Sequence, residues 1–589
     1  MLASQRGRVV GQYAAAALAY GLLALFFTRP LAWAGLGSHA IANLGDPMLN
    51  AYTLAATVRK LSNLDLLHYY DLNFFFPYPA AGTFTENFFS TSLLLAWPLS
   101  LTTTNFVAIH NLITLIAMVL SALAALALAR ELTGHFGAGF AAGIVFAFAP
   151  AKLAHIGRLQ IQAAFWLPLT LLFVHRALRT RRPRDAMLAA LCFFLNAGAN
   201  GHYLFFATVA IAIVAATALE HQHWRRQCAL LALLLALGAL SALPLYLPYV
   251  GAHGAMGFHR DLTEVAAFSA SVTAYFSTTD GNLLYRWLLP TGRGEATLFW
   301  GALPTLAMIA LLAQQIRRAR QHALVASAVR PLAAYLLLLV VALVFSLGPY
   351  LGVDGALPNL LYLAGYHWWP GFDGIRAAAR WGILALLAVS VLVAFAIQAL
   401  ALRWPRRAMA TSALCSLLLV AEYVDAPIAL APLPDGGRPP AVYTWLAQQP
   451  GNDPVIELPL PRAWTFAENE KEYLRLYWSA QHWHPIFNGH SGYAPPLYLR
   501  ALASSAEQQL EIARAIGIRY VILHRHDCLS DDEFVALRGV LVAAGEARVR
   551  LQYDDGKSNV YELLDRNTAF DPARCEPCSA AAASAFSNR

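Results

Sequence analysis

Long apolar runs alternate with short clusters of arginine along this chain, and that alternation constrains the fold more than any other feature. Residues 9–27, 106–129 and 381–402 are each about twenty residues long and nearly free of charge, which is the length that a helix needs to cross a bilayer. Of the 589 residues, 58% are hydrophobic and 13% are charged, about half the charged share of a soluble domain. The composition therefore predicts a polytopic membrane protein and excludes a soluble enzyme or a disordered chain.

The arginine clusters assign the two sides of the membrane, because loops rich in Arg and Lys stay in the cytoplasm. Arg6 and Arg8 precede the first run, so we expect a cytoplasmic N-terminus. The runs between later clusters predict about eleven spans and a large first outer loop, residues 28–104. The net charge of +8 is divided among these clusters, which favours membrane lipids as partners and argues against nucleic acid. The later clusters lie at 176–184, 225–226, 317–320 and 403–407.

Two local patterns refine this topology. Residues 32–34 read Ala-Trp-Ala and resemble a signal-peptidase site. Loss of the first span would leave the outer loop untethered, so we expect the span to be retained. Residues 196–202 interrupt an apolar stretch that must cross the membrane an even number of times. We expect two short helices there, joined by an outward-facing turn of Gly and Asn.

The composition becomes that of a soluble domain near the end of the last span, after a linker rich in Pro and Gly. We expect an all-α transmembrane domain over residues 1–430 and a small α/β domain over 431–589. An odd number of spans that starts from a cytoplasmic N-terminus ends on the other side of the membrane, so we expect this second domain outside the cytoplasm. The hydrophobic patterns predict strands at 453–458 and 519–523, a helix at 504–516 and a hairpin turn at 554–557. Outside the cytoplasm a disulfide can form, and its candidate residues are Cys528, Cys575 and Cys578.

Two carboxylates in the first outer loop are candidates for catalysis. Asp46 precedes Pro47, a pattern that also starts a helix, with the carboxylate capping the free amides. The positive helix end keeps such a carboxylate ionised, so it can accept a proton from a hydroxyl nucleophile. Glu86 is the second candidate, and its alternative role is that of a solvated loop charge. In the same loop we expect the aromatic segment 71–79 at the membrane interface and 88–95 as a surface or re-entrant helix.

The second outer loop is unusually basic for its side of the membrane. It carries Lys152, His155, Arg158 and Gln160 within nine residues. A phosphate would explain this concentration, because Lys, Arg and His hold an anionic leaving group and Gln donates to its oxygens or to sugar hydroxyls. The alternative is that these side chains extend to lipid headgroups.

Further outer-face residues extend the candidate site. Arg376 and Arg380 lie one helical turn apart and are a second pair of candidates for phosphate, or partners of Asp373 or of headgroups. In the C-terminal domain, neighbouring aromatic and amide side chains suit sugar binding, although packed loops show the same pattern. The candidate cavity or acceptor-side residues are His202, Tyr203, Glu295, His484, Asn488 and Tyr493.

Four stretches of the chain resemble bacterial membrane glycosyltransferases of the GT-C class. Such enzymes transfer a sugar from a polyprenyl-phosphate carrier and use no nucleotide sugar. The resemblance implies a bacterial inner-membrane location and an acidic residue of the first outer loop as catalytic base, the position that Asp46 matches. The stretches are Gly45-Asp46-Pro47, Phe148-Ala149-Pro150 through His155 and Gln160 to Trp166-Leu167-Pro168, Gly371-Phe372 through Arg376 to Arg380, and Asn488 to Tyr493.

The mechanism that this resemblance implies is a single displacement with inversion. Asp46 takes a proton from the hydroxyl of an envelope glycan, lipid or protein acceptor while the oxygen attacks the anomeric carbon. The basic residues then neutralise the departing lipid phosphate. We expect no metal cofactor, because the outer loops contain no Asp-x-Asp motif and the cysteines have too few zinc ligands nearby.

Two other classes of protein are compatible with a polytopic chain. A transporter or lipid flippase would carry ionisable residues near the middle of its spans and paired broken helices in two related halves. A noncatalytic scaffold for envelope assembly would use the C-terminal domain for docking. The polar residues here gather at the outer ends of the spans, and only the interruption at 196–202 resembles a broken pair. The sequence therefore favours a transferase.

Overall fold

The computed structural model describes residues 2–321, 326–351, 357–462, 466–572 and 575. The chain divides into two compact units, and both are built from segments that are distant in sequence. We call the first the helical unit; it comprises Met1–Ala34, Asn111–Leu245 and His259–Ala429. The second, the mixed unit, comprises Gly35–His110, Tyr246–Phe258 and Leu430–Arg589. The division at 430 coincides with the expected boundary, while most of the first outer loop packs with the C-terminal residues.

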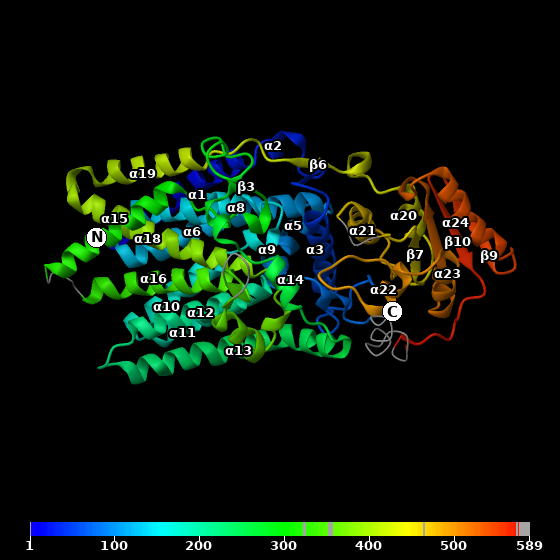
Figure 1. The fold of residues 1–589 in the computed structure, drawn as a ribbon, viewed down its shortest axis with the longest axis horizontal. Coiled ribbons are helices and arrows are strands. Elements are labelled where there is room, and N and C mark those ends of the chain that lie inside the picture. Colours follow the sequence, from blue (N-terminus) through cyan, green and yellow to red (C-terminus); the bar gives the residue numbers. More distant parts are fainter. Residues whose placement is uncertain (1, 322–325, 352–356, 463–465, 573–574, 576–589) are drawn as a thin grey trace. The chain divides into compact units, whose positions relative to one another are not determined.

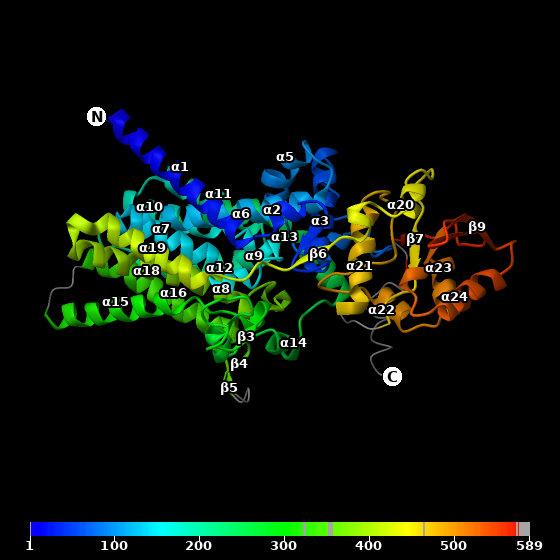
Figure 2. The ribbon, with the colours of Figure 1, turned by 90° about the horizontal axis from the view of Figure 1, so that it is seen from above.

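Helices stand at the positions of all the expected spans in the described residues, and those of the helical unit run side by side (Figures 1 and 2). Seven candidate spans are long and apolar enough to cross a membrane, which confirms a multi-pass architecture. The interruption at 196–202 separates two helices, as expected. The long helices are α1 (Leu2–Phe27), α6 (Phe106–Thr133), α7 (Phe136–Phe148), α10 (Trp166–Thr180), α11 (Pro183–Ala197), α12 (Gly201–Ala218), α13 (Trp224–Met256), α15 (Ala302–Arg320), α16 (Ala326–Ser346), α18 (Gly382–Arg403) and α19 (Ala408–Tyr423).

Helix α18 forms the centre of the helical unit. Every residue from 382 to 394 is buried, and the helix packs against α7, α15, α16 and α19. A helix that is apolar on all faces has no side to present to water, so it takes the central position. Small residues permit close packing elsewhere: a Cβ at Gly143 of α7 would lie 2.6 Å from the carbonyl oxygen of Ala122.

A four-stranded sheet organises the C-terminal part of the mixed unit. Its order is β7 (Val455–Leu458), β8 (Tyr520–His524), β10 (Ser558–Leu563) and β9 (Val549–Asp554). Strands β7 and β8 are parallel, and the other two pairs are antiparallel. The expected strands and hairpin are therefore present. The expected helix is α23 (Ala506–Ala515), and Ser505 and Gln508 close a capping box at its start. The other helices here are α20 (Ala441–Leu446), α21 (Phe466–Ser479), α22 (Pro496–Leu502) and α24 (Asp531–Ala543).

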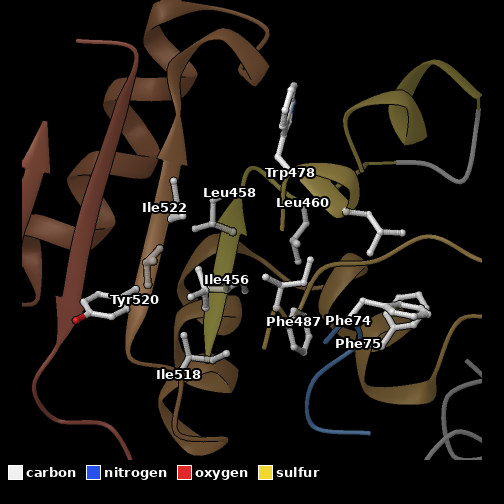
Figure 3. Packing of buried hydrophobic residues seen from close by; sticks show 14 of the residues in the cluster. Phe74, Phe75, Ile456, Leu458, Leu460, Trp478, Phe487, Ile518, Tyr520 and Ile522 are labelled. Atoms are coloured by element: carbon white, nitrogen blue, oxygen red, sulfur yellow. The ribbon is translucent and has the colours of Figure 1, made fainter. Parts of the chain in front are cut away.

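The aromatic segment 71–79 lies in the core of the mixed unit, so its expected place at the membrane interface is wrong. Phe74 is 1% exposed and Phe75 is fully buried. Both belong to the same buried cluster as Phe487, and Figure 3 shows them next to that residue, near β7. The backbone amide of Phe75 donates to the carbonyl oxygen of Asn488 at 3.2 Å, which joins two segments more than 400 residues apart. Aromatic residues and prolines suit a buried loop as well as a lipid interface. The two locations can be told apart only when the segment that packs on residues 71–79 is known.

Shorter elements complete the mixed unit. Helix α3 (Asp46–Ser62) begins at the expected Asp-Pro pair, and β1 (His39–Ile41) pairs with β6 (Leu430–Pro432). The expected helix at 88–95 is a short helical stretch, α4 (Phe89–Thr91), η2 (Ser92–Ala96) and α5 (Trp97–Ser100), which is too short to span a bilayer. Cys528 is a free thiol, whereas Cys575 is in a disulfide whose partner lies outside the described residues.

Candidate functional site

The basic loop of the helical unit is held in a fixed shape by its own side chains. Two short helices, α8 (Pro150–Leu153) and α9 (Leu159–Gln162), frame it. Gln162 donates from Nε2 to the carbonyl oxygens of Lys152 and His155, each at 3.0 Å. In return, Lys152 donates from Nζ to the carbonyl oxygens of Ile161 and Gln162. These bonds satisfy backbone groups that such short helices leave unpaired, so the loop is preorganised.

Lys152 is fully buried, and its ammonium group contacts backbone oxygens. Its alternative role of reaching toward lipid headgroups is therefore wrong. A phosphate contact by Lys152 stays a prediction. The bonds that the structure shows make it a positioning residue for the loop. Gln160 is also buried, and its backbone carbonyl oxygen accepts a hydrogen bond from the Asn200 side chain at 3.4 Å.

Arg158 and Arg380 converge on one carboxylate, that of Glu295. The Arg158 Nη1 atom lies 2.5 Å from Glu295 Oε1, and the Arg380 Nε atom lies 3.5 Å from the same oxygen. Glu295 belongs to the 3₁₀ turn η4 (Gly294–Ala296), and Arg380 to the turn η6 (Ala378–Trp381). Two guanidinium groups thus share one carboxylate, so the cluster keeps a positive charge. Gly294 has a φ of +57° beside the Arg158 guanidinium, a conformation that glycine adopts readily.

The charges in this cluster set the protonation of its members. Burial acts to raise the pKa of Glu295, but the charges of Arg158 and Arg380 outweigh it and hold that pKa well below its usual range. Burial, reinforced by Arg158, lowers the pKa of His155 to about 3. His155 is therefore neutral at pH 7 in this structure and offers a ring N–H rather than a charge, and its contact with a phosphate stays a prediction. Its Nδ1 lies 3.1 Å from Arg158 Nη1, which always donates, so Nε2 carries the ring proton.

The buried state of His155 predicts a pH dependence of stability. An unfolded histidine has a pKa of about 6.5, so between that value and 3 the unfolded chain binds one more proton than the folded chain. The free energy of unfolding should therefore fall as the pH falls, by up to about 1.4 kcal/mol per pH unit from this residue. We expect His155→Gln, which keeps an acceptor for Arg158, to melt with a shallower pH slope between about pH 5 and pH 7. If the variant and the unmodified protein had the same pH slope, burial of a neutral His155 would not be the cause of the pH dependence.

The turn between α11 and α12 packs against the basic loop. Tyr203 donates from its hydroxyl to the carbonyl oxygen of Ile161 at 2.9 Å, and it is almost fully buried. His202 bonds through Nδ1 to Asn200 Oδ1 at 3.0 Å. Its buried Nε2 has no hydrogen-bond partner within the part of the chain that the structure describes. The two outer turns are therefore neighbours, as expected; Tyr203 braces the loop and His202 is left as the candidate ligand-binding group.

The two arginines after Gly371 do not share a helix. Arg380 lies in η6, whereas Arg376 lies before that turn and places its guanidinium 4.7 Å from the centre of the Phe268 ring. The expectation of one helical face carrying both is therefore wrong, because the backbone of Ala377 between them is not helical, with φ −101° and ψ 88°. Arg380 pairs with Glu295, a partner that was not expected.

Asp46 and Glu86 both lie in the mixed unit. Asp46 is the first residue of α3, half-buried, with Pro47 as the second. Gly45 is the capping residue, so the capping role considered for the Asp46 side chain has no support in the helix geometry. A carboxylate in the first turn of a 17-residue helix faces the positive end of the helix dipole. Glu86 is half-buried in the loop that precedes α4, beside Asn87, whose side chain bonds to the Tyr70 hydroxyl at 3.2 Å.

Two of the three candidates of the C-terminal domain are buried in its core, and Tyr493 is half-buried against that core. Asn488 is fully buried and exchanges two hydrogen bonds with the backbone of Glu457, at 2.7 and 3.0 Å. His484, also buried, bonds through Nδ1 to the carbonyl oxygen of Asp453 at 2.9 Å. Tyr493 stacks on Phe258 with ring centres 4.5 Å apart. These contacts favour the alternative of packed loops over sugar binding at these three positions.

Two arrangements were not predicted from the sequence. One is the sharing of Glu295 by two arginines, because the three residues are far apart along the chain. The other is a buried charge network in the mixed unit, centred on Arg475 of α21. The spacing of Glu472 and Arg475, which is three residues on one helix face, was the available signal. Among the described residues, no three or more His, Cys, Asp or Glu side chains gather as metal ligands would.

No protein-family model and no curated protein matches the sequence. Solved structures do match. One is arabinofuranosyltransferase AftD from Mycobacteria, a mutant form, with a TM-score of 0.54 and 14% identity over 93% of this chain and 41% of that chain. Another is ArnT from Cupriavidus metallidurans bound to undecaprenyl phosphate, with a TM-score of 0.46 and 13% identity over 96% of this chain and 99% of that chain.

The match to AftD concerns the fold. This chain spans about two fifths of the AftD chain, and the matched region includes nearly all of the residues here. The expected architecture, a polytopic helical part with a small α/β part, is thereby confirmed as a fold that this chain shares with AftD. At 14% identity the likeness does not carry over individual residues, so the roles of the site residues follow from the geometry described above.

Proposed function

We propose that this chain is a membrane glycosyltransferase that moves a sugar from a polyprenyl-phosphate donor to an extracytoplasmic acceptor, with inversion. The observation that carries the proposal is the cluster of Arg158, Arg380 and Glu295, set on preorganised loops in a fold of the GT-C type. Two arginines around one carboxylate leave a positive charge, and arginine binds phosphate oxygens in a bidentate manner.

The basic cluster supplies the site for the leaving group. A departing lipid phosphate gains negative charge as its bond to the anomeric carbon breaks. Arg158 and Arg380 donate to its oxygens, exchanging part of their interaction with Glu295 for the stronger one with phosphate. Glu295 holds both guanidinium groups in place before the donor binds. His155 is neutral and contributes a ring N–H rather than a charge.

Asp46 acts as the catalytic base in this proposal. The acceptor oxygen attacks the anomeric carbon as the bond to the phosphate oxygen breaks, and the acceptor proton passes to the Asp46 carboxylate. Attack from the face opposite the phosphate inverts the anomeric centre. This role rests on the position of Asp46 at a helix start and on the resemblance of Gly45-Asp46-Pro47, and it requires access to the same substrate as the basic cluster.

A bacterial plasma membrane with the site on its outer face is the location that fits this chemistry, because the arginine-rich loops then face the cytoplasm. No metal takes part in the proposed step, since guanidinium groups supply the charge that a metal would otherwise provide.

Envelope glycans from cells with and without this protein provide the test. We expect mass spectrometry to show one sugar missing from a defined glycan when the protein is absent, and its return when the protein is restored. Purified protein in lipid nanodiscs should then transfer that sugar from its polyprenyl phosphate. A glycan profile that does not change would contradict a transferase and favour a scaffold. A missing sugar without transfer by the pure protein would favour a transporter of the lipid-linked sugar.

A further inference from the structure

A cavity of about 660 Å³ lies entirely within the mixed unit, at the C-terminal end of α3. This volume is in the range of sites for small ligands. None of the residues assigned above to catalysis or to phosphate binding lines it. The walls come from the end of α3 and the residues that follow it, from the segment 71–79, and from the C-terminal part of the unit, where the lining residues are Gly451, Asn452, His482, Trp483, Pro485 and Pro572.

One wall of the cavity is aromatic. Trp483 lines it, and the guanidinium of Arg59 lies 4.5 Å from the centre of the indole ring. A guanidinium over an indole is a favourable cation–π contact, which fixes the ring without burying it. Pro77, Pro79 and Pro485 add flat apolar surface. A fixed indole beside such surface suits the C–H faces of a sugar ring.

The polar lining of the cavity is balanced in charge. It contains two cations, Arg59 and Lys60, and two carboxylates, Asp65 and Asp71. Lys60 donates to Asp65 at 2.7 Å, so much of this charge is paired internally. Amide side chains of asparagine add groups that both donate and accept. Hydroxyl groups also donate and accept, whereas a phosphate would meet two repelling carboxylates. The lining therefore favours an uncharged ligand rich in hydroxyls.

His482 also lines the cavity, and one of its ring nitrogens is a hydrogen-bond donor without an acceptor among the described residues. Its Nδ1 accepts from the backbone amide of His484 at 3.1 Å. Burial lowers the pKa of His482 to about 4, so the ring is neutral and its proton lies on Nε2. Within the described ranges, this buried Nε2 has no hydrogen-bond partner. Buried polar groups without partners are uncommon in folded proteins, and they often mark functional sites.

Strained backbone gathers at the same cavity. Trp483 has a φ of +60°, a left-handed conformation that is a rare choice for a bulky residue. Leu64, Phe75 and Ala80, with φ between +51° and +55°, each adjoin a lining residue. Non-glycine residues with a left-handed backbone conformation concentrate at binding and active sites, where the surrounding structure maintains the strain.

The cavity and the candidate base lie at opposite ends of one helix. Asp46 begins α3, and Arg59 follows thirteen residues later, which corresponds to a separation of about 20 Å along the helix axis. A ligand that reaches both ends must be extended and several sugar units long.

We propose that this cavity binds an uncharged oligosaccharide segment of the acceptor, several sugars away from the hydroxyl that is glycosylated. That the bound oligosaccharide is part of the acceptor rests on the proposed function. Binding of an oligosaccharide itself requires no catalysis. Trp483 stacks on a sugar ring, and the polar lining bonds to its hydroxyls. The enzyme would thus select long acceptors over short ones.

Binding of oligosaccharides to the full chain in lipid nanodiscs tests this inference. The probes are neutral oligosaccharides released from the envelope glycans of the source cell, separated by length and labelled at the reducing end, with binding followed by fluorescence polarisation. We expect Trp483→Gly to bind the longer probes at least roughly tenfold more weakly than the unmodified protein. Glycine adopts a positive φ without strain, so this variant adds no backbone strain, and its melting temperature is measured beside that of Trp483→Phe to separate lost binding from lost packing. Trp483→Phe should retain most of the binding.

Two controls separate this inference from the proposed function. Trp97→Ala removes an exposed tryptophan of the same unit that does not line the cavity, and it should bind normally. Asp46→Asn should also bind normally, whatever its effect on transfer. Absence of probe binding to the unmodified protein, or equal binding by Trp483→Gly, would overturn the inference and leave the transferase proposal standing. Transfer retained by Asp46→Asn would instead overturn the base role and leave the cavity inference standing.

Discussion

Replacement of Asp46 by Asn should reduce the initial rate of sugar transfer by a factor of about 10²–10⁴, the usual contribution of a general base. The amide has the shape of the carboxylate but cannot take the acceptor proton. Purified variant and unmodified protein would be compared in nanodiscs, with the sugar and polyprenyl phosphate that the glycan analysis identifies. Because Gly45 caps α3, loss of the charge should cost only about 0.3–1 kcal/mol in helix-dipole interaction, so the variant should fold.

Glu86→Gln is the matched control for this prediction, because it neutralises the other candidate carboxylate of the same loop. We expect Glu86→Gln to retain most of the activity. The opposite pattern, an active Asp46→Asn and an inactive Glu86→Gln, would transfer the role of base to Glu86. Activity in both variants would show that neither carboxylate removes the proton.

A large loss of stability is expected for Arg475→Leu in the mixed unit. Arg475 is 3% exposed and donates to Glu472 at 2.7 Å and to Asp527 at 2.5 Å, with Glu457 4.0 Å away. Removal of this guanidinium leaves Glu472 and Asp527 without the cation that bridges them, and breaking a buried ion pair in this way typically costs about 3–5 kcal/mol. Thermal unfolding of the full chain should show a clearly lower transition for the mixed unit.

The control for this effect is Arg500→Leu, which changes an exposed arginine on α22. It should melt within about 0.5 kcal/mol of the unmodified protein, as most surface substitutions do. If Arg475→Leu melted like Arg500→Leu, the buried network would contribute little to stability. Such a result would mean that leucine packing compensates for the lost ion pairs, as happens when whole buried networks are replaced.

The helices were predictable because the bilayer imposes a simple rule on sequence. A span must be apolar over a fixed length, and arginine clusters mark its ends, so hydropathy locates α6 and α18 without any knowledge of their neighbours. The sheet of the mixed unit was predictable for a similar reason, since β7 and β8 are short apolar runs bounded by turn residues.

Contacts between distant segments were not predictable. Phe74 and Phe75 have the composition of interface anchors, and their burial depends on residues 486–488, which complete the core from the far end of the sequence. His155 was expected to be a cation, but its charge depends on burial and on Arg158, which the sequence does not reveal. The site residues were named by type and side of the membrane, whereas the pairing of Arg158 and Arg380 through Glu295 required the fold.

The most direct test is to determine on which side of the membrane the candidate base Asp46 and the basic cluster lie. Short epitope tags would be inserted at exposed Asn43, three residues before Asp46, at exposed Leu288 in the loop that carries Glu295, and at Arg184 in the arginine-rich loop. Impermeant antibodies should label the first two tags in intact spheroplasts and the third only after lysis. Labelling of Asn43 and Leu288 from opposite sides would contradict a single site that uses Asp46 and Arg158.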